Sequence, residues 1–257
     1  MNLRPVLDSS YTRPGGYGLV PRDYSIHPKC CFAFAPEEYP DDLLVPESDI
    51  DGLLQDMIAK KDDLLSLREA KFSVLQSLDQ NGFGLCWAFS STKAMMYLRA
   101  IQNEPDEILS AWYVAGKVKG WRDQGGFGGE SLNFIAKSGV PAMSFCPDYH
   151  SRNDTPECEA NAKLHVAGSW WECSEDPNKA YHQACSAYIR FMVPTIQDFD
   201  WLGHSMCVAA FLGYKNPHSA ADNSWGNQGD RGLYDLKGNH ALPNGCWIPR
   251  VIRPAAA

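Results

Sequence analysis

Apolar residues recur at helical spacing in several stretches of the first half of the chain. Within residues 46–71, leucine, isoleucine and methionine recur among acids and lysines at near-helical intervals, and Ser48 is followed by acids typical of a helix start. This pattern predicts an amphipathic helix. Further helices are predicted where apolar residues are dense and glycine and proline are rare, at residues 86–101, 106–119, 130–137 and 178–190.

The pattern changes after residue 191. Residues 208–214 form a short apolar run without helical periodicity, which is typical of a buried strand, and residues 232–236 and 247–252 are further strand candidates. Residues 1–46 and 147–178 are polar or rich in proline, so we predict extended or irregular structure there. A helical first half followed by a β-rich second half predicts an α+β fold.

Length and charge narrow the class of protein. The 257 residues suffice for one large domain or for two lobes that share a core, and 44% apolar with 21% charged residues is an ordinary globular composition. The formal net charge is −8 and no basic stripe stands out, which argues against a nucleic-acid partner. No stretch approaches the about 20 apolar residues of a membrane span, so we expect no membrane association.

The start of the chain bears on localisation. Residues 1–11 are polar, are interrupted by Pro5, and contain neither an apolar core nor a small-residue cleavage site. No signal peptide is therefore visible, and we expect a cytoplasmic protein. A secreted protein that has lost its leader has the same sequence pattern, and that alternative stays open.

The nine cysteines include no CxxC pair, which argues against a zinc ribbon or a thioredoxin-type redox site. An odd number leaves at least one cysteine without a partner in the chain. Because no secretion signal is visible, we expect reduced, half-buried cysteines and neither a metal nor a cofactor. This includes four that are spaced like a metal or disulfide cluster: Cys146, Cys158, Cys173 and Cys185.

The segment from Gln80 to Ser90, QNGFGLCWAFS, carries the clearest chemical signal. A cysteine directly before a helix lies among unpaired backbone N–H groups at the positive end of the helix dipole, which favours the thiolate. Gly82 and Gly84 let the chain turn tightly and leave room for a substrate backbone. The side-chain amide of Gln80 can donate a hydrogen bond to a developing oxyanion. Cys86 is therefore the candidate nucleophile.

A thiolate nucleophile needs a base, and His204 is the candidate because it opens the apolar run from Ser205 to Phe211. A histidine at the mouth of a buried strand can be held rigidly while its ring faces a site. A third group must fix the tautomer of the ring. Asn223 can accept a hydrogen bond from one ring nitrogen, and Trp225 can shield that bond from water.

Together these motifs resemble those of the papain family of cysteine peptidases. The segment around Cys86 is similar to the family's nucleophile motif, with the glutamine six residues upstream. Gly203-His204-Ser205 resembles its histidine motif, and Asn223-Ser224-Trp225-Gly226 resembles its asparagine motif. Gly128-Gly129, ahead of a predicted helix, resembles the paired glycines that bind substrate backbone. The resemblance extends over roughly residues 72–252, in the family's order of cysteine, histidine and asparagine.

The resemblance implies a two-lobed α+β fold, with a helical N-terminal lobe, a β-barrel-like C-terminal lobe and the active-site cleft between them. Residues 1–71 would then be an N-terminal extension or insert that contains the amphipathic helix. Residues 72–150 would form the helical lobe that carries the nucleophile. Residues 151–257 would form the β-rich lobe that carries the histidine and the asparagine.

The resemblance also implies a cysteine-type endopeptidase that acts on a peptide or protein substrate. Cys86 would attack the peptide carbonyl, His204 would protonate the leaving amine, and water would release the acyl-enzyme. Gln80 and the backbone N–H of Cys86 would form the oxyanion hole. Glu130 falls where the family's second specificity pocket opens, which predicts a preference for a basic residue. The implied substrate contacts are Gly128, Gly129, Glu130, Trp225 and Trp87.

Several positions depart from the family pattern. A cysteine pair usual in the family is replaced by Phe83 and Gly126, and we expect Phe83 to fill the space. Leu85 replaces a small residue beside the nucleophile and could crowd the cleft. No inhibitory propeptide signature is recognisable in residues 1–71. Three roles stay open for the helix predicted within residues 48–70: it covers the cleft, it binds a protein partner, or it only packs against the rest of the protein.

Two other functions fit the same residues. One is a papain-like protein with weak or no activity that serves as a binding or structural component of a larger assembly, which Leu85 and the N-terminal insert leave open. The other is thiol acyl transfer by the same cysteine and histidine. Transfer of the acyl group to an added amine, rather than release to water, would distinguish it from hydrolysis.

Overall fold

The computed structural model describes residues 4–11, 18–34, 36–149 and 154–253. Within them, eight strands form one sheet in the order β1-β7-β6-β5-β4-β8-β3-β2. The central strands pair antiparallel, whereas the short edge strands β1 and β2 pair parallel with β7 and β3. The strands are β1 Val6–Leu7, β2 Pro36–Glu38, β3 Val166–Glu172, β4 Thr195–Phe199, β5 His204–Gly213, β6 His218–Asp222, β7 Leu233–Lys237 and β8 Gly245–Arg253.

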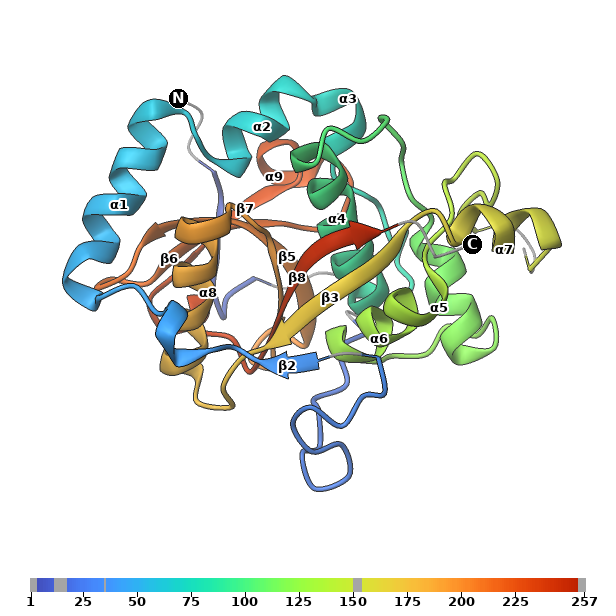
Figure 1. Ribbon diagram of the computed structural model, residues 1–257, viewed down its shortest axis with the longest axis horizontal. Coiled ribbons are helices and arrows are strands. Elements are labelled where there is room, and N and C mark those ends of the chain that lie inside the picture. Colours follow the sequence, from blue (N-terminus) through green and yellow to red (C-terminus); the bar gives the residue numbers. More distant parts are fainter. Residues whose placement is uncertain (1–3, 12–17, 35, 150–153, 254–257) are drawn as a thin grey trace.

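A long helix, α4 (Cys86–Ile101), lies at the centre of the molecule and is buried along almost its whole length (Figure 1). Its alanine-, methionine- and leucine-rich sequence contains neither glycine nor proline, which favours a helix that packs on all sides. It packs against β5. Figure 1 shows α5 (Ala111–Lys119), α6 (Gly128–Ser138) and α7 (Pro156–Ala162) on one side of the molecule and α1 (Glu47–Lys60) and α8 (Pro177–Phe191) on the other.

The predicted α+β class is confirmed, and the helices predicted at residues 86–101, 106–119, 130–137 and 178–190 all form. The second of them begins later than predicted because Ser110 caps it, accepting a hydrogen bond from the N–H of Tyr113 at 3.2 Å. No helix in the described part of the chain is both long and apolar enough to cross a membrane. Shorter helical segments are α2 Leu64–Ala70, α3 Phe72–Leu75, α9 Gln228–Arg231, η1 Asp41–Leu43 and η2 Gly238–Ala241.

The single helix predicted within residues 46–71 is two helices, α1 and α2. The first ends at Lys61, which adopts a left-handed conformation with φ of 57°. Asp63 then begins a new helix, because its side chain accepts hydrogen bonds from the N–H groups of Leu65 and Ser66. The apolar spacing continues across this break, so periodicity alone does not locate it.

The prediction of a mainly irregular segment at residues 147–178 is wrong. It contains α7, which Thr155 caps and Pro156 opens, and the strand β3. The strands β4 and β6 were also not predicted, and β5 begins at His204 rather than at residue 208. β4 is buried at every position, so it lacks the alternating pattern that marks a half-exposed strand. The domain boundaries at residues 71 and 150 stay predictions.

Two cysteines that we expected to be reduced form a disulfide. Cys146 and Cys158 are joined, and they pack with Tyr113 and Ala162 in a small apolar cluster apart from the main core. The described residues include all nine cysteines, and the other seven are free thiols in the structure. Because disulfides persist mainly in oxidising compartments, this one weakens the argument for a reducing environment.

Candidate active site

Cys86 is the first residue of α4, as the sequence predicts. Its sulfur accepts a hydrogen bond from the backbone N–H of Ser205 at 3.4 Å, which brings the start of α4 against the start of β5. The side chain of Leu85 is buried and belongs to the hydrophobic core. Phe83 packs between Trp112 and Tyr149, in line with the expectation that it fills apolar space.

His204 and Asn223 are hydrogen-bonded partners on neighbouring strands. The distance from His204 Nε2 to Asn223 Oδ1 is 2.7 Å, and both residues are buried. An amide oxygen can only accept, so Nε2 carries a proton and the neutral ring has its lone pair on Nδ1. The Trp225 ring stacks on the imidazole with centroids 4.9 Å apart, which keeps water from the bond. The predicted orientation of the histidine is therefore present.

Gln80 lies against the asparagine motif. Its Oε1 accepts a hydrogen bond from the Ser224 hydroxyl at 2.5 Å, and its backbone N–H donates to the Ser224 carbonyl at 2.8 Å. The side-chain amide nitrogen donates to the Phe83 carbonyl, within the turn that precedes Cys86. Segments that lie far apart in the sequence thus bring Gln80, Cys86, His204 and Asn223 to one place.

Of the predicted substrate-contact residues, Gly128, Gly129 and Trp87 are buried, whereas Glu130 is partly exposed and paired with a lysine. Gly128 and Gly129 are buried in the first turn of α6, where an added Cβ would meet the Trp247 ring within about 3 Å. The carboxylate of Glu130 is ion-paired with Lys119 at 2.7 Å, so its charge is already compensated. The Trp87 side chain is buried and donates to the Gln124 carbonyl at 3.3 Å.

A segment that the sequence did not single out, extended at first and then folded into turns, lies against this site. We call residues 18–34 the strap. Its Leu19 N–H donates to the Gly203 carbonyl at 3.2 Å, and its Val20 N–H donates to the Gly126 carbonyl at 3.0 Å. Gly18 lies so close to Gly84 that an added Cβ would be 2.0 Å from the Gly84 carbonyl oxygen. The strap therefore touches three segments around Cys86, and the cysteine has no exposed surface.

The predicted insert does not lie over Cys86. Helix α1 packs on α8 and β5, and the Asp51 carboxylate accepts the backbone N–H of Tyr214 at 2.6 Å at the far end of β5. Of the alternatives considered for the insert, covering the cleft is excluded for α1 and packing is observed. The segment that lies against the site is the strap, which precedes α1 and belongs to the same predicted extension of residues 1–71.

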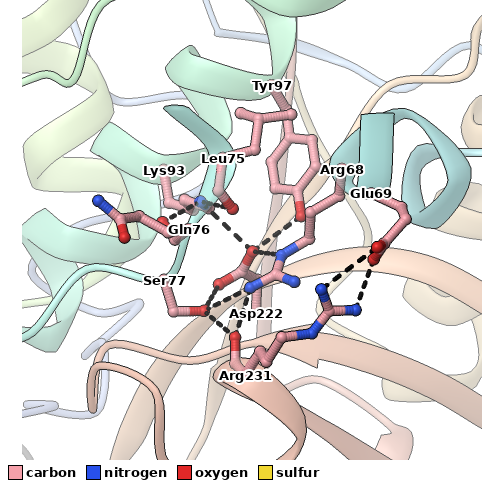
Figure 2. A network of polar contacts seen from close by, with 9 residues as sticks. All are labelled: Arg68, Glu69, Leu75, Gln76, Ser77, Lys93, Tyr97, Asp222 and Arg231. Atoms are coloured by element: carbon pink, nitrogen blue, oxygen red, sulfur yellow. Dashed lines mark hydrogen bonds and ion pairs between the residues drawn. The ribbon is translucent and has the colours of Figure 1, made fainter. Parts of the chain in front are cut away.

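A buried network of charges surrounds Asp222, the residue that precedes Asn223 (Figure 2). Asp222, the preceding residue, accepts hydrogen bonds from Arg68 Nε at 2.9 Å and from the Tyr97 hydroxyl at 2.8 Å. Lys93 Nζ lies 3.5 Å from the same carboxylate, and burial lowers the pKa of Lys93 while the charge of Asp222 raises it. These contacts tie the asparagine motif to α2 and α4.

Burial also dominates the electrostatics of the nucleophile. It raises the pKa of the Cys86 thiol well above its ordinary value, whereas the Ser205 N–H acts in the opposite direction. The charge of Asp198 on β4 raises the pKa of the thiol further. Together these effects favour the neutral thiol over the thiolate. No group of His, Cys, Asp and Glu side chains among the described residues is arranged to hold a metal ion.

Asp198 should make stability depend on pH. Burial raises its pKa from 3.8 to about 7, against hydrogen bonds from the Ser205 side chain and the Gly128 N–H. Between pH 5 and pH 8 the folded protein must lose a proton that the unfolded chain has already lost, so stability falls as the pH rises. We expect the free energy of unfolding of wild type to fall by roughly 2 to 3 kcal/mol more than that of Asp198→Asn between pH 5 and pH 8, as measured by denaturant unfolding. The control Asp42→Asn, at an exposed position, should show the same pH dependence of stability as wild type. If stability changed with pH in Asp198→Asn as it does in wild type, the prediction would be contradicted.

Comparisons with known proteins address the fold. No protein-family model matches the sequence. No curated protein sequence matches it either. Xylellain, a cysteine protease from Xylella fastidiosa, matches 98% of this chain and 99% of its own at 15% identity, with a TM-score of 0.64.

Two further solved structures match a smaller part of this chain. Bromelain from Ananas comosus, in complex with the E64 inhibitor, matches 72% of this chain and 97% of its own at 17% identity, with a TM-score of 0.57. Digestive procathepsin L 3 from the larval midgut of Tenebrio molitor matches 69% of this chain and 66% of its own at 17% identity, with a TM-score of 0.55. At such identities the similarity establishes the architecture, and this chain has the two-lobed α+β fold of the papain-like cysteine proteases.

Proposed function

We propose that the protein is a cysteine-type endopeptidase. The observation that carries the proposal is the 2.7 Å hydrogen bond from His204 Nε2 to Asn223 Oδ1, beside a cysteine at the N-terminus of a buried helix. This bond leaves Nδ1 as the ring atom that exchanges a proton with the thiol. A cysteine, an oriented histidine and a nearby amide donor form the set of groups needed for acyl transfer through a thioester.

The proposed reaction has two halves. Proton transfer from Cys86 to His204 gives a thiolate, which attacks the peptide carbonyl, and the oxyanion accepts hydrogen bonds from Gln80 and the Cys86 N–H. The tetrahedral intermediate collapses, the C–N bond breaks, and His204 returns its proton to the leaving amine. His204 then removes a proton from water, the hydroxide attacks the thioester, and the acid leaves with regeneration of the thiol.

The strap must move before a substrate can react. Gly126 exchanges backbone hydrogen bonds with the strap, its N–H donating to the Gly18 carbonyl at 3.0 Å. We assign this residue, rather than Gly128 and Gly129, to pairing with the substrate backbone, because it already binds an extended chain next to Cys86. Opening would also readmit water to the site and lower the cost of forming the thiolate.

Labelling of the cysteine tests the proposal. The purified protein is treated with a neutral epoxide inactivator and mapped by peptide mass analysis, beside Cys86→Ala and His204→Ala. We expect modification at Cys86 alone, none in Cys86→Ala and a much slower reaction in His204→Ala. Hydrolysis products and products of transfer to an added amine are then compared, which separates a peptidase from a thiol acyl transferase.

No labelling, or equal labelling of several cysteines, would reject the peptidase. The closed site, with Cys86 fully buried, would then favour the alternative of a catalytically silent papain-like protein that binds a partner. A test of whether the insert at residues 47–70 contacts such a partner needs the intact chain. Deletion of the insert would remove Arg68, which belongs to the buried network around Asp222.

Weakening the strap should speed labelling. The guanidinium of Arg22 forms a buried ion pair with Glu172, and the loss of one partner of such a pair leaves an uncompensated charge that destabilises the closed state. We expect Arg22→Gln to raise the labelling rate of Cys86 at least about tenfold. Lys29→Gln, which removes a strap cation whose partner Glu38 is exposed, should change it little. Equal rates in all three proteins would show that the strap does not limit access.

A further inference from the structure

The strap places one arginine deep in the molecule. The side chain of Arg22 is 3% exposed and forms an ion pair with Glu172, which is itself buried. Its remaining N–H groups donate to the carbonyls of His27 and Pro28 at 2.9 and 2.8 Å, both within the strap. The guanidinium thus has one partner in the body of the protein, and that partner is a carboxylate.

A second buried carboxylate lies nearby. Asp198 is 3% exposed, and its Oδ1 has no hydrogen-bond partner among the described residues. Asp198 Oδ2 accepts a hydrogen bond from the N–H of Gly128 at 3.2 Å, and Gly128 directly follows Phe127, whose ring the Arg22 guanidinium approaches. In line with this placement, the positive charge of Arg22 lowers the pKa of Asp198. On its other side Asp198 pairs with Ser205 in the sheet, next to the sulfur of Cys86.

The surroundings suit a flat cation. The Arg22 guanidinium lies 5.6 Å from the centroid of the Phe127 ring, which belongs to the body of the protein and follows Gly126 directly. It also lies 4.5 Å from the Tyr24 ring and 5.5 Å from the Phe32 ring, both of which belong to the strap. Phe127, Glu172 and Asp198 all belong to the body of the protein, whereas Arg22 belongs to the strap.

We propose that Glu172, Asp198 and Phe127 form a subsite for a basic side chain of the substrate, which Arg22 fills when the strap is closed. We call these three residues the Arg22 site. The inference rests on the proposed peptidase function and adds a substrate class to it: peptides that carry arginine close to the cleaved bond. Leu19 pairs with Gly203 next to His204, Val20 pairs with Gly126, and Arg22 follows two residues later, so the basic residue lies within about four positions of that bond.

The cost of unpaired buried charge is the physical reason for this preference. Two carboxylates at low exposure are stable only with a compensating cation or after protonation. A substrate arginine offers a planar guanidinium that can bind the carboxylates and stack on Phe127 as Arg22 does. Glu130, predicted from the sequence to select basic residues, cannot serve in this way while it is paired with Lys119.

Paired peptides test the proposal on the full chain. Each peptide carries arginine, or its neutral isostere citrulline, at one of the four positions before the cleaved bond, and kcat/KM is measured for both. We expect the arginine peptide to react at least tenfold faster at one position. This ratio should fall below threefold in Asp198→Asn and in Glu172→Gln, and should be unchanged in Glu38→Gln, an exposed acid on β2. Loosening of the strap in a variant affects both peptides equally and cancels in the ratio.

The outcomes separate the two proposals. Equal rates for arginine and citrulline at all four positions, with Cys86 labelled by the neutral epoxide, would overturn the Arg22 site and leave the peptidase intact. Absence of both cleavage and labelling would overturn both. If neither acid variant folds, the ratio in wild type decides alone, because a ratio near one excludes a charge-selective subsite whatever the variants do.

Discussion

Replacing Cys86 by serine is expected to lower kcat/KM for peptide hydrolysis by a factor of at least about 10⁴. A serine hydroxyl has the same shape but a far higher pKa, and the His204–Asn223 pair is placed to activate a thiol. Rates are measured with a fluorogenic peptide, after circular dichroism has shown that the variant is folded. Cys185→Ser, at a buried thiol on α8 outside the candidate site, should retain activity.

Other substitutions at the site should give graded losses. His204→Ala removes the base and should cost nearly as much as Cys86→Ser, since the two groups act as a unit. Gln80→Ala removes one donor to the oxyanion and should cost about 10² to 10³ in kcat. If Cys86→Ser kept more than about a hundredth of the activity, another residue would be the nucleophile and the assignment would fail.

Replacing Asp222 by asparagine is expected to lower the free energy of unfolding by roughly 3 to 5 kcal/mol. The change leaves Arg68 and Lys93 buried, 2% and 3% exposed, without the anion that compensates them (Figure 2). The Tyr97 and Ser77 hydroxyls would also lose a charged acceptor. Urea unfolding of the variant and wild type at one pH gives the difference directly.

A second substitution separates charge from shape. Lys93→Met in the Asp222→Asn background removes one of the stranded cations, so the double variant should recover part of the loss. Glu69→Gln is the matched control within the same view, because its partner Arg231 is about half exposed and the pair should contribute less than about 1 kcal/mol. An Asp222→Asn protein within 1 kcal/mol of wild type would show that the network is solvated rather than buried.

The parts of the site that could be predicted are those written in short local motifs. Cys86 and His204 each begin an element whose apolar pattern is readable nearby. Asn223 follows β6, which was not predicted, and was found from its own short motif. The structure brings all three together. The long buried helix after Cys86 was equally clear, because its composition leaves no alternative to a helix. The order of the motifs then implied the architecture.

The parts that could not be predicted depend on contacts between distant segments. The run from Gly125 to Gly129 contains two glycine pairs, and nothing local tells which of them meets an extended chain; in the structure Gly126 does. The buried acids Asp198 and Asp222 lie in strands that show no alternation, and their partners are at least 70 residues away or come from other elements. The strap has an irregular composition that gives no sign of where it docks.

The strap belongs to the same chain as the site that it blocks, so the degree of blocking does not depend on the protein concentration. A tethered segment competes at an effective concentration fixed by its attachment, so dilution of the protein cannot release it, whereas a separate inhibitor would dissociate. If the strap is open in one molecule in a hundred, every substrate and inactivator binds about a hundredfold more weakly than it would to the open site. Differences in apparent affinity between ligands would then report on the ligands alone, and a change that shifts all of them by one common factor would report on the strap.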